Sequence, residues 1–187
     1  AVDHDMTVVM GGPHVTMTGT AALEHAELDI LVHGEGEVTL VELLHTWEKG
    51  GDIAAVAGIS FRRDGVFQTT PKRTFIQDLD SIPFPARGLL DPDRYRIQKK
   101  RSTMMVTSRG CPLNCSYCCT TRRLSGGYRK RNVEDVLEEF RDCFLRHGIT
   151  HFDIEDENAT FDRERARALF QSLIRMFHGK GVLLTAM

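Results

Sequence analysis

The stretch STMMVTSRGCPLNCSYC, residues 102–118, carries most of what this sequence tells about its fold and chemistry. A β-type run, Ser102–Thr107, leads directly into a loop with three cysteines at the spacing CxxxCxxC, at positions 111, 115 and 118. Three thiolates on so short a loop can each reach a different iron of a 4Fe-4S cube. A fourth iron is then left without a protein ligand, and a small molecule can bind there.

A structural zinc site is the main alternative for these cysteines. Zinc usually takes four protein ligands from paired knuckles. No second knuckle is present, and Cys143 and His151 lie on separate expected elements. The chain has five cysteines, an odd number, and no export signal, which favours reduced thiols over a disulfide framework. The spacing therefore favours a cluster over zinc.

The elements that follow the loop alternate regularly. A helix at residues 133–147, with Asn132 as its cap and Gly148 as its stop, precedes a strand at 150–155. A second helix starts at the cap Asp162, and a strand at 182–185 follows it. This order implies parallel strands joined by right-handed helical crossovers, in an open sheet or a barrel, with functional groups on loops after the strands.

The region before residue 100 predicts a second α/β unit. Short strands at 7–10 and 29–32 alternate with a helix at 37–47, which suggests a doubly wound sheet. The helix is expected to place one apolar face on the sheet, made of Leu40, Leu43, Leu44 and Trp47. Asp64-Gly65 between two β-type runs predicts a two-residue hairpin. The proline-rich stretch 71–95 predicts a linker and a domain boundary.

Composition and charge exclude several classes of protein. The chain has 187 residues, 41% hydrophobic and 27% charged, as an ordinary globular protein has. It has no apolar run of about 20 residues and no signal peptide, so a cytoplasmic chain without a membrane span is expected. Neither end looks complete, which predicts a fragment.

Charge is distributed unevenly along the chain. Residues 94–133 contain eleven Lys or Arg and no acid, whereas residues 134–164 contain eleven acids and three bases. The basic block is either a solvated or nucleic-acid-binding face, or the place of an anionic cofactor and an acidic redox partner. Only Tyr128 could offer a stacking aromatic, so nucleic acid is not the expected partner.

Residues 107–118, TSRGCPLNCSYC, resemble the signature loop of the radical S-adenosylmethionine (radical SAM) enzymes. The segments GGPHVT, DILVHGEGE, IQDLDSIPFPAR, GGYRKRNVEDVLEEF and HFDIEDENATFDRER resemble the cobalamin (vitamin B12)-binding subgroup. The resemblance implies an α/β fold in which residues 1–70 are the C-terminal part of a Rossmann-like cobalamin-binding domain. Residues 71–99 are then a linker, and residues 100–187 are the first half of a TIM-like (β/α)6 radical SAM partial barrel.

The resemblance also implies roles for residues of the cysteine loop. Cys111, Cys115 and Cys118 ligate three irons of a 4Fe-4S cluster, and the amino and carboxylate groups of S-adenosylmethionine chelate the fourth. Tyr117 lies near the adenine. An electron donor such as flavodoxin or ferredoxin, both acidic, supplies the electron.

Further roles follow from the same resemblance. One of Glu155, Asp156 and Glu157, after the second strand, contacts the cofactor's amino nitrogen, and all three stay candidates. Gly11 and Gly12 are either the diglycine that lets backbone approach cobalamin or merely a tight turn.

The implied activity is reductive cleavage of S-adenosylmethionine to a 5′-deoxyadenosyl radical, followed by cobalamin-dependent methyl transfer or by ring formation or rearrangement on an unknown substrate. Two other classes stay open. An iron-sulfur electron-transfer module needs a fourth thiolate and ignores S-adenosylmethionine, and a zinc-stabilised RNA-binding module is colourless.

Overall fold

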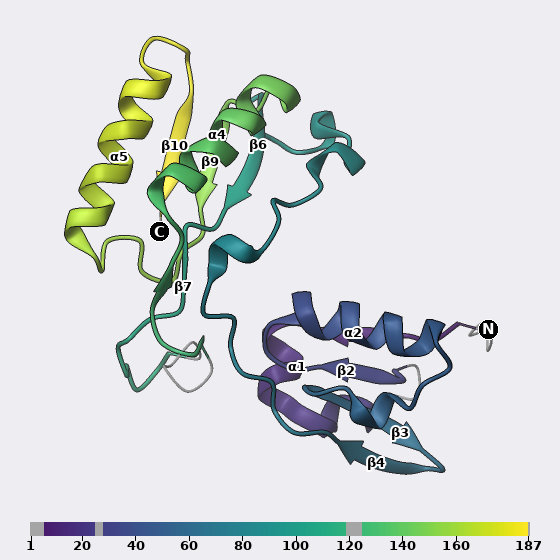
Figure 1. The fold of residues 1–187 in the computed structure, drawn as a ribbon. Coiled ribbons are helices and arrows are strands. Elements are labelled where there is room, and N and C mark those ends of the chain that lie inside the picture. The colour runs from purple at the N-terminus through teal and green to yellow at the C-terminus, as the bar shows by residue number, and fades with distance from the viewer. Residues whose placement is uncertain (1–5, 25–27, 119–124, 187) are drawn as a thin grey trace. The chain divides into compact units, whose positions relative to one another are not determined.

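Residues 6–24, 28–118 and 125–186 are described by the computed structural model (Figure 1). The chain divides into two units, Ala1–Ile76 and Gln77–Met187, and each combines helices with a sheet. The coarse prediction of a mixed α/β fold is therefore confirmed. No helix of the described ranges has the length and apolar character that a membrane span requires.

The first unit is built on a four-stranded mixed sheet. Its elements are β1 (Val9–Gly11), α1 (Pro13–Thr18), a 3-10 helix (Gly19–Glu24), β2 (Ile30–Val32), α2 (Gly36–Glu48), a 3-10 turn (Ile53–Ala55), β3 (Ile59–Arg63) and β4 (Val66–Thr69). The strand order is β1-β2-β3-β4. β1 and β2 are parallel, whereas β2, β3 and β4 pair antiparallel.

The predicted hairpin is confirmed. Arg63 pairs with Val66, and the two residues between them, Asp64 and Gly65, have φ of 51° and 77°. Two positive φ values are what a two-residue turn needs to match the twist of its strands.

The predicted apolar face of α2 is confirmed at Leu43 and wrong at its other three residues. Thr39 and Leu43 are buried, whereas Leu40, Leu44 and Trp47 are exposed. From α2, Leu43 packs in the cluster of Ile30, Val32, Ile59 and Phe61.

The second unit contains the parallel strands. Its elements are 3-10 turns at Leu79–Ser81, Arg87–Leu89 and Pro92–Arg94, then β5 (Arg96–Ile97), β6 (Lys100–Met105), β7 (Ser108–Arg109), β8 (Arg129–Lys130), α4 (Val133–His147), β9 (His151–Ile154), α5 (Arg163–Phe177) and β10 (Leu183–Ala186). The order of the main sheet is β10-β9-β6-β5, in which β6, β9 and β10 are parallel as predicted.

Both long helices cover one face of this sheet (Figure 1). The buried core contains Met105 of β6, Phe152 and Ile154 of β9, Phe140 of α4 and Leu169 of α5. Side chains alternate along a strand, so the neighbours of these strand residues face the opposite side of the sheet.

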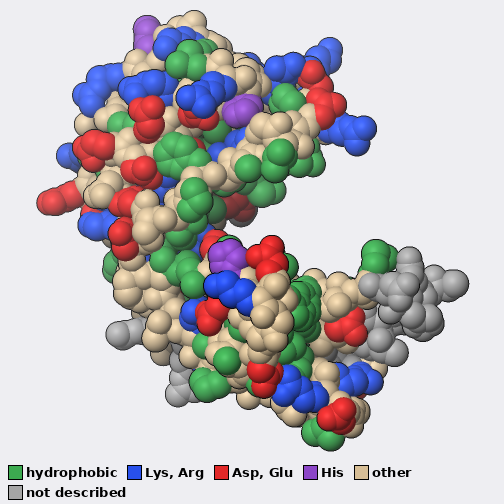
Figure 2. All heavy atoms as spheres, turned by 45° about the vertical axis from the view of Figure 1, so that its right-hand side comes forward, with side chains coloured by type: hydrophobic (Ala, Val, Ile, Leu, Met, Phe, Trp, Pro, Cys, Tyr) green, Lys and Arg blue, Asp and Glu red, His purple; other side chains and the backbone are tan. Residues whose placement is uncertain are grey.

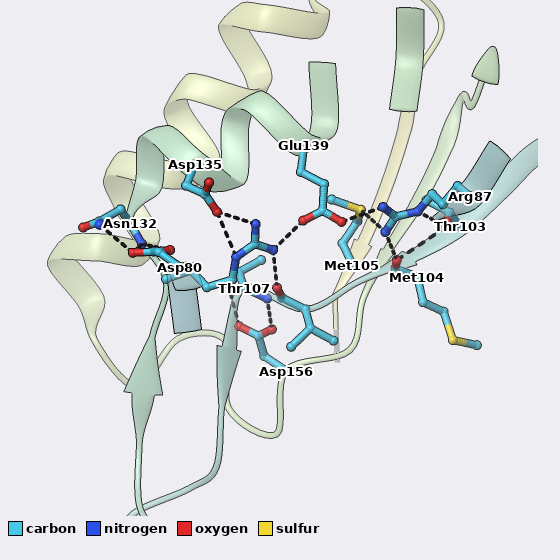
Figure 3. A network of polar contacts seen from close by, with 12 residues as sticks. Asp80, Arg87, Thr103, Met104, Met105, Thr107, Asn132, Asp135, Glu139 and Asp156 are labelled. Atoms are coloured by element: carbon cyan, nitrogen blue, oxygen red, sulfur yellow. Dashed lines mark hydrogen bonds and ion pairs between the residues drawn. The ribbon is translucent and has the colours of Figure 1, made fainter. Parts of the chain in front are cut away.

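The residues expected to form a linker, 71–99, are divided between the units. Arg73 forms an ion pair with Glu42 in the first unit. From Gln77 onward the segment packs on the second unit, where Asp80 accepts hydrogen bonds from the backbone and side-chain nitrogens of Asn132 (Figure 3). The sequence predicted that the Asn132 side chain caps α4, and this prediction is wrong: its side-chain amide donates to Asp80 instead.

Candidate cofactor site

The cysteine loop leaves the sheet at the carboxyl end of β6 and returns to start α4. Its two ends form a short antiparallel ribbon, β7 with β8, in which Ser108 pairs with Lys130 and Arg109 with Arg129. At the base of the ribbon the Arg131 nitrogen donates to the Thr107 carbonyl at 3.1 Å. The arrowheads of β6 and β9 point to the end of the sheet from which β7 leaves (Figure 1).

Gly110 stands immediately before the first cysteine, where the two arms of the loop approach each other. Its φ is +80°, and a Cβ placed there would lie 2.1 Å from the Gly127 carbonyl oxygen. No residue with a side chain fits this position. The close approach fixes where the chain enters the cysteine loop.

The three predicted ligands lie on this loop, and none of them is in a disulfide. Cys111, Cys115 and Cys118 are all half-buried, and the Cys118 nitrogen donates to the Cys115 carbonyl at 3.1 Å. Tyr117 is 91% exposed. In the described part of the chain no group of three or more His, Cys, Asp or Glu side chains is close enough to hold a metal ion. Three accessible thiols are nevertheless the donor set that a cluster with one open iron requires.

Cys143 differs from the loop thiols. It lies in the core on α4, and burial raises the pKa of its thiol to about 11. A thiol that stays protonated at neutral pH is a poor ligand and a poor nucleophile. Its place on α4, away from the loop, agrees with the expectation that it belongs to a separate element.

The carboxylates after β9 differ in what they contact. Asp156 is 3% exposed and accepts three hydrogen bonds at 2.6 Å, from the Thr107 nitrogen, the Thr107 hydroxyl and the Ser108 hydroxyl (Figure 3). Glu157 is exposed, and its Oε2 accepts from the Gly110 nitrogen at 2.9 Å. Both side chains thus bind the entry to the cysteine loop.

Glu155 lies on the other side of the strand, next to Asp153. Partial loss of water contact, followed by the neighbouring Asp153 carboxylate, raises the pKa of Glu155. Its nitrogen donates to the Met105 carbonyl at 2.9 Å, which holds it at the end of the β6–β9 ladder. The structure therefore brings the carboxyl ends of β6 and β9 together, as predicted.

Arg165 is a residue of this site that sequence reasoning missed. Its Nη2 donates to the carbonyls of Thr107 at 2.8 Å and Arg131 at 3.0 Å, and its Nη1 donates to the Thr107 hydroxyl at 3.3 Å. It is 7% exposed. A cation in the first turn of a helix is unfavourable next to the positive end of the helix dipole. The position of Arg165 in the predicted first turn was therefore the one signal in the sequence that it has another partner.

In the first unit, Gly11 ends β1 and Gly12 precedes α1. Gly12 has a φ of 102°, which favours glycine, and a Cβ at that position would contact nothing within 4 Å. A Cβ on Gly11 would make only ordinary contacts with Val32, at 3.6 Å or more. Packing alone does not require glycine at position 11.

Most described bases of the basic block have acidic partners. Ion pairs join Arg94 with Asp91, Arg96 and Arg101 with Asp93, Lys130 with Asp162, and Arg131 with Asp135 and Glu139. Figure 2 shows basic and acidic side chains interspersed over this unit. Arg122 and Arg123 lie outside the described residues.

Comparison with known proteins gives several relatives, although no family model matches the chain. The chain is 34% identical over 166 residues to the uncharacterized methyltransferase PH0819 of Pyrococcus horikoshii, covering 88% of this chain and 36% of the relative. It is 31% identical over 181 residues to the anaerobic magnesium-protoporphyrin IX monomethyl ester cyclase of Rubrivivax gelatinosus, covering 93% and 32%. It is 33% identical over 177 residues to the cobalamin-dependent radical SAM methyltransferase TokK of Streptomyces tokunonensis, covering 90% and 26%.

Among solved structures, the chain resembles the radical S-adenosylmethionine methyltransferase TsrM from Kitasatospora setae, determined with cobalamin and a [4Fe-4S] cluster bound. The TM-score is 0.69 over 96% of this chain and 37% of that chain, at 19% identity. A likeness at this identity shows the fold.

The parallel strands, the three-cysteine loop at the end of the first of them and these homologies place the chain in the radical SAM family. Within that class the chain belongs to the cobalamin-binding subgroup, whose members among its relatives include methyltransferases and cyclases. The chain spans about a third or less of the length of these relatives.

Proposed function

We propose that the chain holds a 4Fe-4S cluster through Cys111, Cys115 and Cys118 and binds S-adenosylmethionine at the open iron. The observation that carries the proposal is the placement of three cysteines, none in a disulfide, on one loop at the carboxyl end of the first parallel strand. When bound, the cluster supplies the electron that cleaves the cofactor to a 5′-deoxyadenosyl radical. The protein's own residues position the thiols and orient the cofactor.

Glu155 is the carboxylate proposed to contact the cofactor's amino group. Support comes from its neighbours, because Asp156 and Glu157 are engaged by loop backbone whereas Glu155 lies beside a second carboxylate, Asp153. A bound ammonium group relieves the repulsion between two adjacent carboxylates. Tyr117, which is exposed, is proposed to close on the adenine.

The test is anaerobic iron-sulfur reconstitution, then electron paramagnetic resonance of the dithionite-reduced protein with and without S-adenosylmethionine. We expect a brown protein whose signal shifts on adding the cofactor. Cys115→Ala should lose the cluster and Cys143→Ala should keep it, since Cys143 lies in the core. A signal indifferent to the cofactor would point to electron transfer instead, and a colourless, zinc-loaded protein would refute the proposal.

The first unit is proposed to belong to a cobalamin-binding domain, with Gly11 and Gly12 where backbone approaches the ligand. Gly11→Ala is the sharp test, because its Cβ meets no clash in the fold. We expect unchanged unfolding but weaker cobalamin binding, measured by absorbance after gel filtration. Gly36→Ala, whose Cβ would lie 3.7 Å from Val32, is the matched control. Equal cobalamin binding by both variants would contradict this placement.

The whole protein is proposed to carry out cobalamin-dependent methyl transfer, or ring formation or rearrangement, in the cytoplasm. Support comes from the names of the relatives, which include methyltransferases and a cyclase. An acidic electron donor such as flavodoxin or ferredoxin is proposed from the sequence alone. Its reduction of the cluster should slow with rising salt.

A further inference from the structure

The two ends of the cysteine loop are held by side chains that come from the next β-α unit along the chain. Asp156 follows β9, and Arg165 lies in the first turn of α5. Neither residue is near the loop in sequence, and both are buried. Their contacts are with residues 107, 108 and 131, where the loop leaves the sheet and returns to it.

Asp156 meets a set of donors that only a carboxylate can satisfy fully. Its two oxygens accept one N–H and two O–H groups, each at 2.6 Å, from Thr107 and Ser108. Those residues are each 1% exposed, so water cannot replace the lost partner. An asparagine would direct an NH2 group at one of these donors.

Arg165 joins the outgoing and returning arms. Its guanidinium binds the carbonyls of Thr107 and Arg131, and the Thr107 hydroxyl accepts from Arg165 at 3.3 Å while donating to Asp156. A continuous chain of hydrogen bonds therefore runs from Arg165 through Thr107 to Asp156. The planar fork of an arginine can bridge two carbonyls, which an ammonium group does poorly.

We propose that Asp156 and Arg165 are positioning residues, which fix both ends of the cysteine loop and so set where its three thiols lie before any cluster is present. This inference rests on the proposed function. In this proposal neither Asp156 nor Arg165 contacts the cluster or the cofactor. A ligand set held in advance binds its metal more tightly, because less ordering remains to be done on binding.

The first measurement uses the cluster-free protein. Amide hydrogen exchange over residues 107–118 is followed by mass spectrometry in the wild type, Asp156→Asn and Arg165→Lys. We expect exchange at least tenfold faster in Asp156→Asn, with a smaller increase in Arg165→Lys. Glu138→Gln is the control, because it removes an exposed carboxylate of α4 that pairs with Arg141 rather than with the loop ends.

The second measurement is cluster uptake at limiting iron, read as iron and sulfide per chain and as the shift of the reduced-state signal by S-adenosylmethionine. Asp156→Asn should take up at least fivefold less cluster than Glu138→Gln. If Asp156→Asn does not fold, Thr107→Val and Thr107→Ser decide the matter, because only serine keeps the hydroxyl of the hydrogen-bond chain. Serine should behave as the wild type, and valine should lose loop protection and cluster.

The outcomes separate the inference from the function on which it rests. A wild type that takes up no cluster would refute the function, while the exchange data still decide whether the loop ends are held. A wild type that binds cluster and cofactor, with Asp156→Asn and Thr107→Val equal to Glu138→Gln in both measurements, would overturn the inference alone.

Discussion

Replacing Glu139 by glutamine tests the buried ion network that anchors the segment after Gln77. Glu139 lies on α4 and is 2% exposed. One of its carboxylate oxygens forms an ion pair with Arg87 at 2.6 Å, and the other forms an ion pair with Arg131 at 2.5 Å (Figure 3). Breaking a buried pair by removing one partner costs about 3–5 kcal/mol, because the remaining charge is left uncompensated.

The structure favours the lower end of that range. Arg131 keeps its ion pair with Asp135 at 2.5 Å, and Arg87 keeps hydrogen bonds to the Thr103 hydroxyl and the Met104 carbonyl. We therefore expect a loss of about 3 kcal/mol. For a unit of roughly 100 residues this lowers the melting temperature by about 12 °C, since 1 kcal/mol shifts it by about 4 °C.

The assay is thermal and urea unfolding followed by circular dichroism. Glu138→Gln is the matched control, because Glu138 is the neighbouring residue and forms an exposed pair with Arg141. That substitution should change stability by less than about 0.5 kcal/mol. Limited proteolysis should cut residues 77–99 faster in Glu139→Gln only. Equal unfolding and equal cleavage of the two variants would refute the reasoning that the network anchors this segment.

Three further predictions concern single positions. Gly110→Ala should disorder the start of the cysteine loop and abolish cluster uptake, because its Cβ would lie 2.1 Å from the Gly127 carbonyl oxygen. Gly65→Ala is the control, because a Cβ there would meet nothing within 4 Å; it should lower the free energy of unfolding in urea by only about 1 kcal/mol. The Lys130 ammonium, and then the hydrogen bond from the Arg165 nitrogen, lower the pKa of Asp162 in the folded state. The stability that Asp162 contributes is thus complete above the ordinary aspartate pKa of about 4 and lost as pH falls through its lower folded value. Urea midpoints from pH 6 to pH 2.5 should show a steeper acid loss for the wild type than for Asp162→Asn. Iodoacetamide at pH 8 should alkylate Cys111, Cys115 and Cys118 of cluster-free protein well before Cys143, because the pKa of Cys143 is about 11. Mass spectrometry follows the alkylation of each cysteine, and equally fast alkylation of Cys143 would contradict the prediction.

Local signals were enough to predict several elements. Helix α4 begins and ends at the predicted residues, because its apolar stripe is continuous and Gly148 adopts the left-handed conformation, with φ of 63°, that ends a helix. The Asp162 cap is confirmed by its bond to the Arg165 nitrogen at 3.1 Å. The hairpin at Asp64-Gly65 follows equally from residues adjacent in sequence.

Features that depend on partners distant in sequence could not be predicted. Asn132 has the side chain of a cap but is taken by Asp80, 52 residues earlier. The proline-rich stretch has the composition of a linker, yet Arg87 within it pairs with Glu139. Composition reports how stiff or soluble a segment is, whereas only the fold decides which charges face each other.

The three carboxylates at 155–157 show what the fold adds to the predicted site. Phe152 and Ile154 of β9 point to the helices, whereas Asp153 faces the opposite side. Beyond the end of the strand, Asp156 is linked to Arg165 of α5 through the Thr107 hydroxyl, while Glu155 lies beside Asp153. A carboxylate that already accepts three short hydrogen bonds cannot turn to a ligand without exposing three buried donors. Glu155 does not hold the loop, and it lies beside the Asp153 carboxylate, whose repulsion a bound cation would relieve. Substitutions at 155 and 156 should therefore separate, the first weakening S-adenosylmethionine binding and the second loosening the cysteine loop.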